Sequence, residues 1–213
     1  RRSGILWPEE GYVRYKGKAL SKMSEKELFF HRGKTGFAFQ DAALWSNLTV
    51  FQNLYLPLQF HRHKAHPREL EQRILSLAKE YGLEGDLQLR PAQLSAGKRI
   101  LVSFVRSIVL DPDILFLDEP TTFLDNLTVD RILRTLKQMK KEGKTLLIAT
   151  HSPELTSQLA DRLVVMKGGS ILEAGPVQQV VRSRNPLVIE IISEVLSEAA
   201  VYDTDILELL QED

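Results

Sequence analysis

The sequence predicts an α/β fold with a mainly parallel sheet. Two short apolar runs, at residues 114–117 and 145–150, have the length and composition of parallel strands that are buried on both faces. A helical pattern at 127–141, closed by Gly143, lies between them, as in a strand–helix–strand unit. Residues 50–110 are predicted to be mostly helical, since their apolar residues recur mostly at helical spacing.

The composition is that of a soluble globular protein with a substantial core, since 43% of the residues are apolar and 26% are charged. The 28 basic and 28 acidic residues give zero net charge, so there is no electrostatic case for nucleic acid as the main partner. The absence of cysteine excludes disulfides and thiolate metal sites. No apolar run approaches the roughly 20 residues needed to span a bilayer. Any role at a membrane is therefore expected to run through a partner.

The N-terminal part, residues 11–40, predicts short strands. Residues 11–15 alternate in polarity, and Lys16, Gly17 and Lys18 supply a turn after them. Residues 36–40 form a second candidate strand, which ends on the polar Gln40.

Local signals mark the ends of two helices within residues 50–110. Pro67 is typical of a first helical position, and Gly82 is placed to stop the same helix. Ser95 is a good N-cap for the next helix.

The C-terminal part predicts a hairpin and then helices. Apolar runs at 163–166 and 170–172 flank two glycines at 168–169, which indicates a β-hairpin. From residue 186 onward the chain is acidic, with apolar residues at helical spacing.

Two adjacent carboxylates, Asp118 and Glu119, follow the strand at 114–117. The carboxyl ends of strands in open α/β sheets are where ligands bind. An isolated Asp-Glu pair, however, is better explained as a cap on the following helix. The interpretation therefore depends on what surrounds the pair.

The surrounding motifs form an ordered set that resembles the ATP-binding subunits of ABC transporters over nearly the whole chain. The motifs that carry the resemblance are Gln40 (Q-loop), residues 94–98 (signature motif), residues 114–119 (Walker B strand), Asp125 (D-loop) and His151 (switch histidine).

This resemblance implies a P-loop NTPase-like ABC ATPase core with a mainly parallel sheet, an N-terminal antiparallel β portion, a helical signature-motif lobe and a C-terminal helical tail. Its implied cofactors are ATP and Mg²⁺. The catalytic residues that it implies are Glu119 as general base, His151 and Gln40, with Asp118 and Gln40 as the Mg²⁺ site. The residues implied at the ATP of the opposite subunit or the dimer interface are Ser95, Gly97, Lys98 and Asp125.

The signature motif departs from the family form Leu-Ser-Gly-Gly-Gln at two positions. Ala96 replaces the first glycine, which is harmless if its φ is negative. Lys98 replaces the glutamine and, with Arg99, puts two cations into a first helical turn, where the helix dipole disfavours them. Either the two side chains are solvated at a small cost, or a bound phosphate offsets that cost.

No Gly-rich loop ending Gly-Lys-Ser/Thr occurs in the sequence, although ATP binding requires one. Residues 3–11 resemble the end of the helix that follows that loop, so we expect the P-loop lysine about six residues before Arg1. The expectation is a truncated chain. The alternative is a pseudo-ATPase that never had the loop, but the intact Asp118, Glu119 and His151 argue against it.

The resemblance also implies how the chain is divided. The expected parts are 1–40 (truncated N-terminal part of the ATPase core), 41–105 (helical lobe with Q-loop and signature motif), 106–185 (α/β core with Walker B, D-loop and H-loop) and 186–213 (C-terminal helical extension).

The expected function is to bind and hydrolyse ATP and so power a permease, as a homodimer that reaches the membrane only through transmembrane permease subunits. The expected location is the cytoplasmic face of the inner membrane, as a peripheral subunit. Leu44, Trp45 and Phe51 are candidate permease contacts, although Trp45 could instead pack inside the helical lobe. The alternatives are a regulatory, non-hydrolysing ABC module and a soluble or cell-division ABC ATPase.

Residues 41–58 and 184–188 resemble ATPases of the Mce/Mla type, which implies phospholipid transport. Amino-acid, lipoprotein-release and cell-division subunits share much of the same pattern.

Two further segments leave alternatives open. Three histidines within 61–66 could bind zinc, but the basic neighbours Arg62 and Lys64 favour a solvated loop. The apolar positions of the tail, in a first set at 188–196 and a second at 206–210, either fold back on their own domain or, for the second set, clasp a partner subunit.

Overall fold

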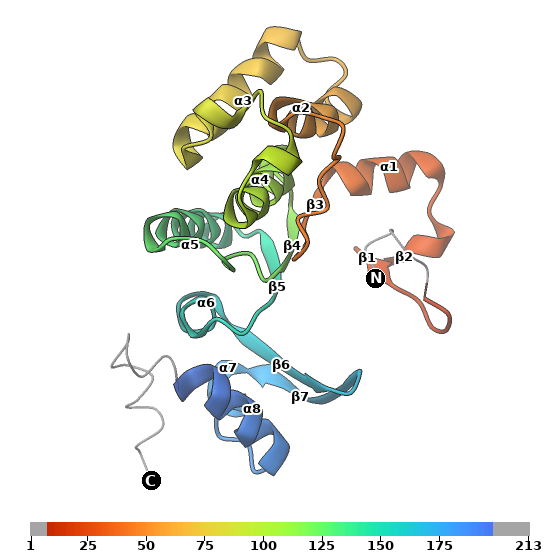
Figure 1. Ribbon diagram of the computed structural model, residues 1–213. Helices are drawn as coiled ribbons and strands as arrows, with labels where there is room; N and C mark the ends of the chain where they lie inside the picture. Colours follow the sequence, from red (N-terminus) through yellow and green to blue (C-terminus); the bar gives the residue numbers. More distant parts are fainter. Residues whose placement is uncertain (1–7, 198–213) are drawn as a thin grey trace. The chain divides into compact units, whose positions relative to one another are not determined.

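The computed structural model describes residues 8–197 (Figure 1). The chain divides into two compact units, one ending at Ala149 and one beginning at Thr150. The predicted clasp by residues 206–210 lies outside the described residues.

The first unit is built on a parallel three-stranded sheet. Its strands are β3 (Thr35–Ala38), β4 (Ile114–Asp118) and β5 (Thr145–Ala149), in the order β3-β4-β5. Ala38 pairs with Leu117, and Asp118 pairs with Ala149, so the carboxyl ends of all three strands meet at one edge. The predicted parallel α/β core is confirmed.

Helices cover the face of the sheet that carries Leu115. Helix α4 (Ala96–Ile108) packs on β3 and β4, and α5 (Asn126–Lys141) packs on β5. A side chain at Gly36, beside Leu115, would meet the Ser107 carbonyl oxygen of α4 at 2.1 Å. The α4 backbone therefore approaches the sheet closely enough to require glycine there.

The other face of the sheet is less covered than the sequence predicts. The rings of Phe37 and Phe116 stack there with centroids 4.8 Å apart and are half-buried, while Leu147 is 47% exposed. Among the residues described, β5 forms one edge of the sheet and no residue in it is fully buried. The predicted burial of 145–150 is therefore not met, because alternate residues of that strand lack a covering layer.

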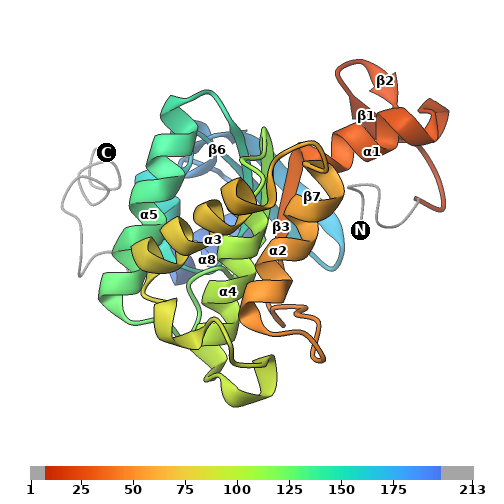
Figure 2. The same cartoon turned by 90° about the horizontal axis from the view of Figure 1, so that it is seen from above.

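Two further helices pack with α4 to form the helical lobe. Helices α2 (Val50–His61) and α3 (Pro67–Tyr81) pack against each other and against α4, as Figure 2 shows. Pro67 occupies the first helical position, and Gly82 ends α3 with a left-handed φ of 68°. Two 3₁₀ turns, η2 (Glu84–Asp86) and η3 (Pro91–Gln93), lead into α4. Lobe side chains that are fully buried include Leu54, Ile74, Tyr81 and Phe104.

The N-terminal part differs from the strands predicted over 11–40. Strands β1 (Arg14–Tyr15) and β2 (Lys18–Ala19) form the expected antiparallel pair, and a 3₁₀ turn, η1 (Leu20–Lys22), follows. Helix α1 (Glu25–Gly33) follows, in a segment for which short strands were predicted. Ser24 and Glu27 form a reciprocal capping box that satisfies two free N–H groups at its start.

The second unit is a hairpin covered by a helix. It contains α6 (Pro153–Leu159), the antiparallel strands β6 (Arg162–Lys167) and β7 (Ser170–Pro176), α7 (Val177–Val180) and α8 (Pro186–Ser197). Val188 and Ile192 of α8 are buried against Val165 and Val180. The first part of the tail therefore folds back on its own unit.

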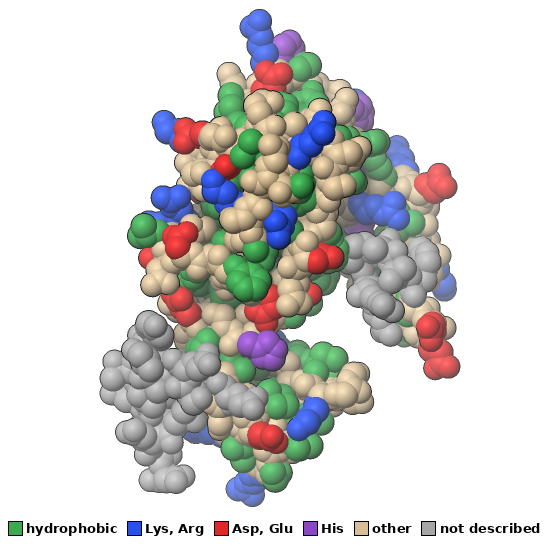
Figure 3. Space-filling view, in the orientation of Figure 1, with side chains coloured by type: hydrophobic (Ala, Val, Ile, Leu, Met, Phe, Trp, Pro, Cys, Tyr) green, Lys and Arg blue, Asp and Glu red, His purple; other side chains and the backbone are tan. Residues whose placement is uncertain are grey.

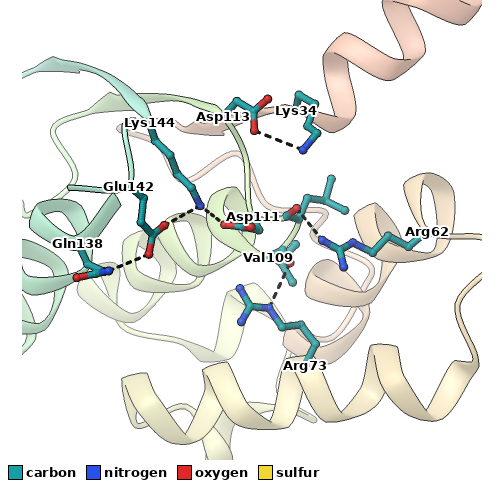
Figure 4. Close-up of polar contacts among 10 residues, drawn as sticks. Lys34, Arg62, Arg73, Val109, Asp111, Asp113, Gln138, Glu142 and Lys144 are labelled. Atoms are coloured by element: carbon teal, nitrogen blue, oxygen red, sulfur yellow. Dashed lines mark hydrogen bonds and ion pairs between the residues drawn. The ribbon is translucent and has the colours of Figure 1, made fainter. Parts of the chain in front are cut away.

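Basic side chains clamp the connection from α4 to β4, at the end of β4 opposite Asp118 (Figure 4). Asp111 in this connection has a positive φ of 56°. The contacts are Arg62 to the Leu110 carbonyl oxygen (3.1 Å), Arg73 to that of Val109 (3.5 Å), Lys34 to Asp113 (3.3 Å), and Lys144 to Asp111 and Glu142.

Charged side chains of both signs are interspersed over the face drawn in Figure 3, rather than gathered by sign.

Candidate functional site

Three predicted site residues leave adjacent strands at the same edge of the sheet. Gln40 lies two residues beyond the end of β3, and Asp118 is the last residue of β4. Gln40 and Asp118 are exposed, and Glu119 is half-buried. The edge therefore presents two carboxylates and, from the neighbouring strand, an amide to solvent.

The backbone at Glu119 is strained. Its φ is 46°, a left-handed value that is rare for residues other than glycine and costs on the order of 1 kcal/mol. Its N–H donates to the Ala149 carbonyl oxygen of β5 at 2.9 Å, which holds the turn in place. Strained residues of this kind concentrate at functional sites.

The start of α4 explains two residues of the predicted signature motif. The Ser95 hydroxyl accepts a hydrogen bond from the Lys98 N–H at 3.2 Å, which confirms Ser95 as the N-cap. Ala96 is the first helical residue and has no positive φ, so an alanine is accommodated there. A side chain at Gly97 would stand 2.4 Å from the Phe123 carbonyl oxygen. Gly97 thus lets the signature segment touch the loop that precedes Asp125.

Lys98 adopts an arrangement that neither sequence interpretation contained. Its ammonium lies 2.7 Å from a carboxylate oxygen of Asp86, whose side chain is only 9% exposed. Arg99 turns back and donates to the Leu94 carbonyl oxygen at 2.8 Å. Both cations of the first turn therefore have protein partners, and Asp86 offsets the unfavourable interaction of Lys98 with the helix dipole.

Asp125 caps helix α5. Its carboxylate accepts from the Thr128 hydroxyl at 2.8 Å and from the Thr128 N–H at 3.0 Å. These two hydrogen bonds lower the pKa of Asp125, the hydroxyl contributing most. The carboxylate therefore remains ionised at the positive end of α5, where the dipole favours it.

The predicted permease contacts lie in and after the loop that follows Gln40. Trp45 is 44% exposed, so it is not packed inside the helical lobe. Leu44 and Phe51 are half-buried, and Phe51 stacks on Tyr55 with ring centroids 5.7 Å apart. The backbone of Trp45 is held by a buried amide, that of Asn53.

Sequence reasoning missed Asn53 and Arg106, both of which hold this loop. Each had a readable signal. Asn53 is a polar residue at helical spacing from the apolar Val50 and Leu56, and Arg106 is the only charged residue between Ile100 and Val109. An unexplained polar residue on an apolar face is expected to have a specific partner.

His151 belongs to the second unit, where it is exposed and directly precedes the cap of α6, Ser152. The histidines at 61–66 have separate contacts. His66 caps α3 by accepting from the Arg68 N–H at 3.2 Å, and His61 stacks on Phe29 with ring centroids 4.5 Å apart. Over residues 8–197, no three histidine or acidic side chains gather as a metal-binding group.

Comparison with known proteins gives a family match over residues 3–122, to the family described as ABC transporter. The methionine import ATP-binding protein MetN of Carboxydothermus hydrogenoformans is 33% identical over 198 residues, 92% of this chain. The chain spans only 58% of that relative's length. The phospholipid transport ATP-binding protein MlaF of Haemophilus influenzae is 29% identical over 191 residues, which is 89% of this chain and 72% of MlaF.

Among solved structures, a dimeric post-hydrolysis form of the ATP-binding cassette MJ0796, bound to ADP and Pi, superposes with a TM-score of 0.73. It is 29% identical, and the match covers 81% of this chain and 76% of that one. The fold and the family match together define an ATP-binding cassette. The chain belongs to the ABC transporter family, as an ATP-binding domain. No helix within the described part of the chain is long and apolar enough to cross a bilayer.

Proposed function

We propose that this chain is part of an ATP-binding and ATP-hydrolysing subunit that powers an ABC transporter permease. The observation that carries the proposal is the sheet edge, where the strained Glu119 follows Asp118 and lies beside the segment that carries Gln40. Ligands of open α/β sheets bind at the carboxyl ends of the strands, which is this edge. The family match and the MJ0796 cassette with ADP and Pi support the same assignment.

Each side chain at the edge has a chemical role in the proposal. The exposed Asp118 carboxylate suits Mg²⁺, which prefers oxygen ligands and needs few from the protein. Gln40 supplies a second oxygen and orients water. Glu119 accepts a proton from the attacking water. His151 belongs to the second unit, and its proposed role is to contact the terminal phosphate. Bound Mg²⁺ would neutralise charge on the phosphates.

ATP binding in this proposal needs a P-loop, which none of the 213 residues supplies. In the described structure, β5 has a paired strand on its β4 side only. An open strand edge offers unpaired N–H and C=O groups to another strand. We propose that a segment outside these residues brings the P-loop and pairs along that edge.

The remaining roles of the signature motif and the loops are also proposals. Ser95, Gly97, Lys98 and Asp125 would face the ATP held by a second copy of the subunit. The exposed Trp45, with the half-buried Leu44 and Phe51, would contact the permease, since an exposed apolar surface can mark a partner site. Such a subunit would lie on the cytoplasmic face of the inner membrane.

Two cargoes are supported to a similar degree. Phospholipid transport is supported by MlaF and by the residues at 41–58, and methionine import by MetN. Because the permease selects the cargo, the test is to co-purify the permease encoded beside this gene. Its ATPase would then be measured in lipid vesicles with and without added methionine. Stimulation by methionine would exclude the phospholipid proposal.

The function itself is tested with Glu119→Gln in the protein extended upstream of Arg1 through a P-loop. The amide keeps the shape of the carboxylate but cannot take a proton. We expect ATP binding within about twofold of the parent and turnover at least about 100-fold lower. The measurements are nucleotide titration and phosphate release. Normal turnover by Glu119→Gln would refute the assignment of the base, and no turnover by the parent would refute the function.

A further inference from the structure

The loop between Gln40 and α2 has an unusual backbone. Ala42 and Ala43 are consecutive and have φ values of 64° and 42°, a conformation that alanine rarely adopts. Ala42 is 2% exposed, so the turn is part of the packed structure. A pair of left-handed alanines persists only where surrounding contacts impose it.

Arg106 supplies one set of those contacts. Its guanidinium donates to the Ala43 carbonyl oxygen at 2.9 Å and to the Ala42 carbonyl oxygen at 3.2 Å. The same group lies over the ring of Trp45, 5.0 Å from its centroid, in a cation–π contact. Burial lowers the pKa of Arg106 to about 10, so the group keeps its charge at neutral pH.

Asn53 holds the other side of the loop. Its side-chain oxygen accepts from the Trp45 N–H at 2.9 Å, and its amide donates to the Trp45 carbonyl oxygen at 3.2 Å. Asn53 is fully buried in α2, whereas Arg106 belongs to α4. The loop is thus fixed between two helices that pack on each other.

The position of Arg106 along α4 connects these contacts to the signature motif at the start of the same helix. Ser95 caps the first turn of this helix, and Arg106 lies near its other end. Nine of the 13 residues of α4 are buried, so the helix can only move as a rigid body with its surroundings. A displacement at the signature end would therefore be carried to the loop that bears Trp45.

We propose that Arg106 is a positioning residue that ties the loop from Gln40 to Trp45 to the signature helix, so that the two move as one piece. This proposal rests on the proposed function for its consequence, which is transmission between the nucleotide edge and the permease. In this proposal Arg106 acts by holding the backbone of its neighbours.

The geometric part is tested by fluorescence in the 213-residue chain. Trp45 and Trp7 are its two tryptophans, so Trp7→Phe isolates the signal of Trp45. In that background, Arg106→Met is expected to increase acrylamide quenching of Trp45 about twofold, because the indole loses its covering cation. Arg106→Lys keeps the charge but not the flat, two-pronged group, and is expected to show most of the same change.

Arg62→Met is the matched control, since it removes another guanidinium bond to a backbone carbonyl, that of Leu110, which is not part of this loop. Figure 4 shows the Arg62 contact. Arg62→Met should leave the quenching of Trp45 unchanged. Unchanged quenching in both Arg106 variants, or an equal change in Arg62→Met, would overturn the proposal. If Arg106→Met does not fold, as judged by circular dichroism, the Arg106→Lys variant decides.

The coupling part is tested in the complete subunit with its permease. Arg106→Met and Arg106→Lys are expected to keep the KM for ATP within about twofold and to lose most of the permease-stimulated kcat, roughly tenfold. Trp45→Ala combined with Arg106→Met should cost no more than either change alone. A raised KM with unchanged stimulation would indicate a merely structural role and refute the coupling. An inactive parent subunit would refute the proposed function while leaving the fluorescence result valid.

Discussion

At the residue scale, several positions are set by backbone contacts rather than by side-chain chemistry. Gly97 is buried and faces the Phe123 carbonyl oxygen, where a Cβ would stand at 2.4 Å. Phe123 itself has a φ of 63°, and Glu119 a φ of 46°. The loop from Glu119 to Asp125 is therefore strained at two points and is packed against the signature segment. The absence of a Cβ at Gly97 makes that packing possible.

Replacing Gly97 by alanine tests this close approach. We expect Gly97→Ala to lower the free energy of unfolding by about 1–3 kcal/mol, because a backbone carbonyl cannot move aside as a flexible side chain can. Urea denaturation followed by circular dichroism measures it. Gly85→Ala is the control, since nothing lies within 4 Å of a Cβ there. Equal stability of the two variants would mean that the Phe123 carbonyl places no constraint on the residue at position 97.

The pair of Lys98 and Asp86 shows how charge, too, acts at the level of single residues. The carboxylate is nearly buried, and its partner stands at a helix start, where a cation alone is unfavourable. Each member compensates for the position of the other. A family motif with glutamine at residue 98 would have no such need.

At the scale of the element, α8 shows how an amphipathic helix completes a small unit. A two-stranded hairpin is marginal by itself in water. Val188 and Ile192 bury one face of α8 against Val165 of the hairpin and Val180 of α7. Lys167 of β6 also lies 3.7 Å from Glu190, an exposed ion pair that contributes little. Apolar packing therefore holds α8 in place.

Two isoleucines on α8 give a matched test of that packing. Ile192 is 9% exposed and Ile189 is 47% exposed. Ile192→Ala is expected to destabilise the second unit by about 2–4 kcal/mol, through lost burial and a cavity. Ile189→Ala should change stability by less than about 0.5 kcal/mol. Hydrogen exchange of the β6–β7 amides measures the stability of the second unit directly. Equal protection of these amides in both variants would argue against the packing of α8 through Ile192.

At the scale of the whole molecule, the sheet is the feature that joins the motifs. Parallel pairing brings the ends of β3, β4 and β5 to one edge, although they are far apart in the sequence. Among the residues described, β5 remains an edge strand with Leu147 exposed. An edge and an apolar face of this kind can accept another strand and its cover.

ATP affinity tests the dependence on a P-loop. We expect the 213-residue chain to bind ATP with a Kd weaker than about 1 mM, because no Gly-rich loop cradles the phosphates. Extending it upstream through a P-loop should restore micromolar binding. Isothermal titration calorimetry measures both. Micromolar binding by the shorter chain would refute the requirement.

Features that depend on near neighbours could be predicted from the sequence. The cap at Ser95, the first turn at Pro67 and the stop at Gly82 each involve contacts within about four residues, so local chemistry encodes them. The apolar runs at 114–117 and 145–150 predicted the parallel strands, and with them the edge that presents Asp118. Helix α1 was equally local. Its capping box at Ser24 and Glu27 was readable, and the strand prediction over 11–40 overlooked it.

Contacts between distant segments became visible in the folded structure alone. Arg106 holds carbonyls more than 60 residues away, and Lys98 pairs with Asp86 across a turn. Neither pairing follows from periodicity, because periodicity tells which residues face inward but not which of them meet. The same limit applies to Gly97, whose neighbour Phe123 lies beyond an intervening helix and strand. Packing chose these partners, since a buried polar or backbone group must be satisfied by whatever the fold places beside it.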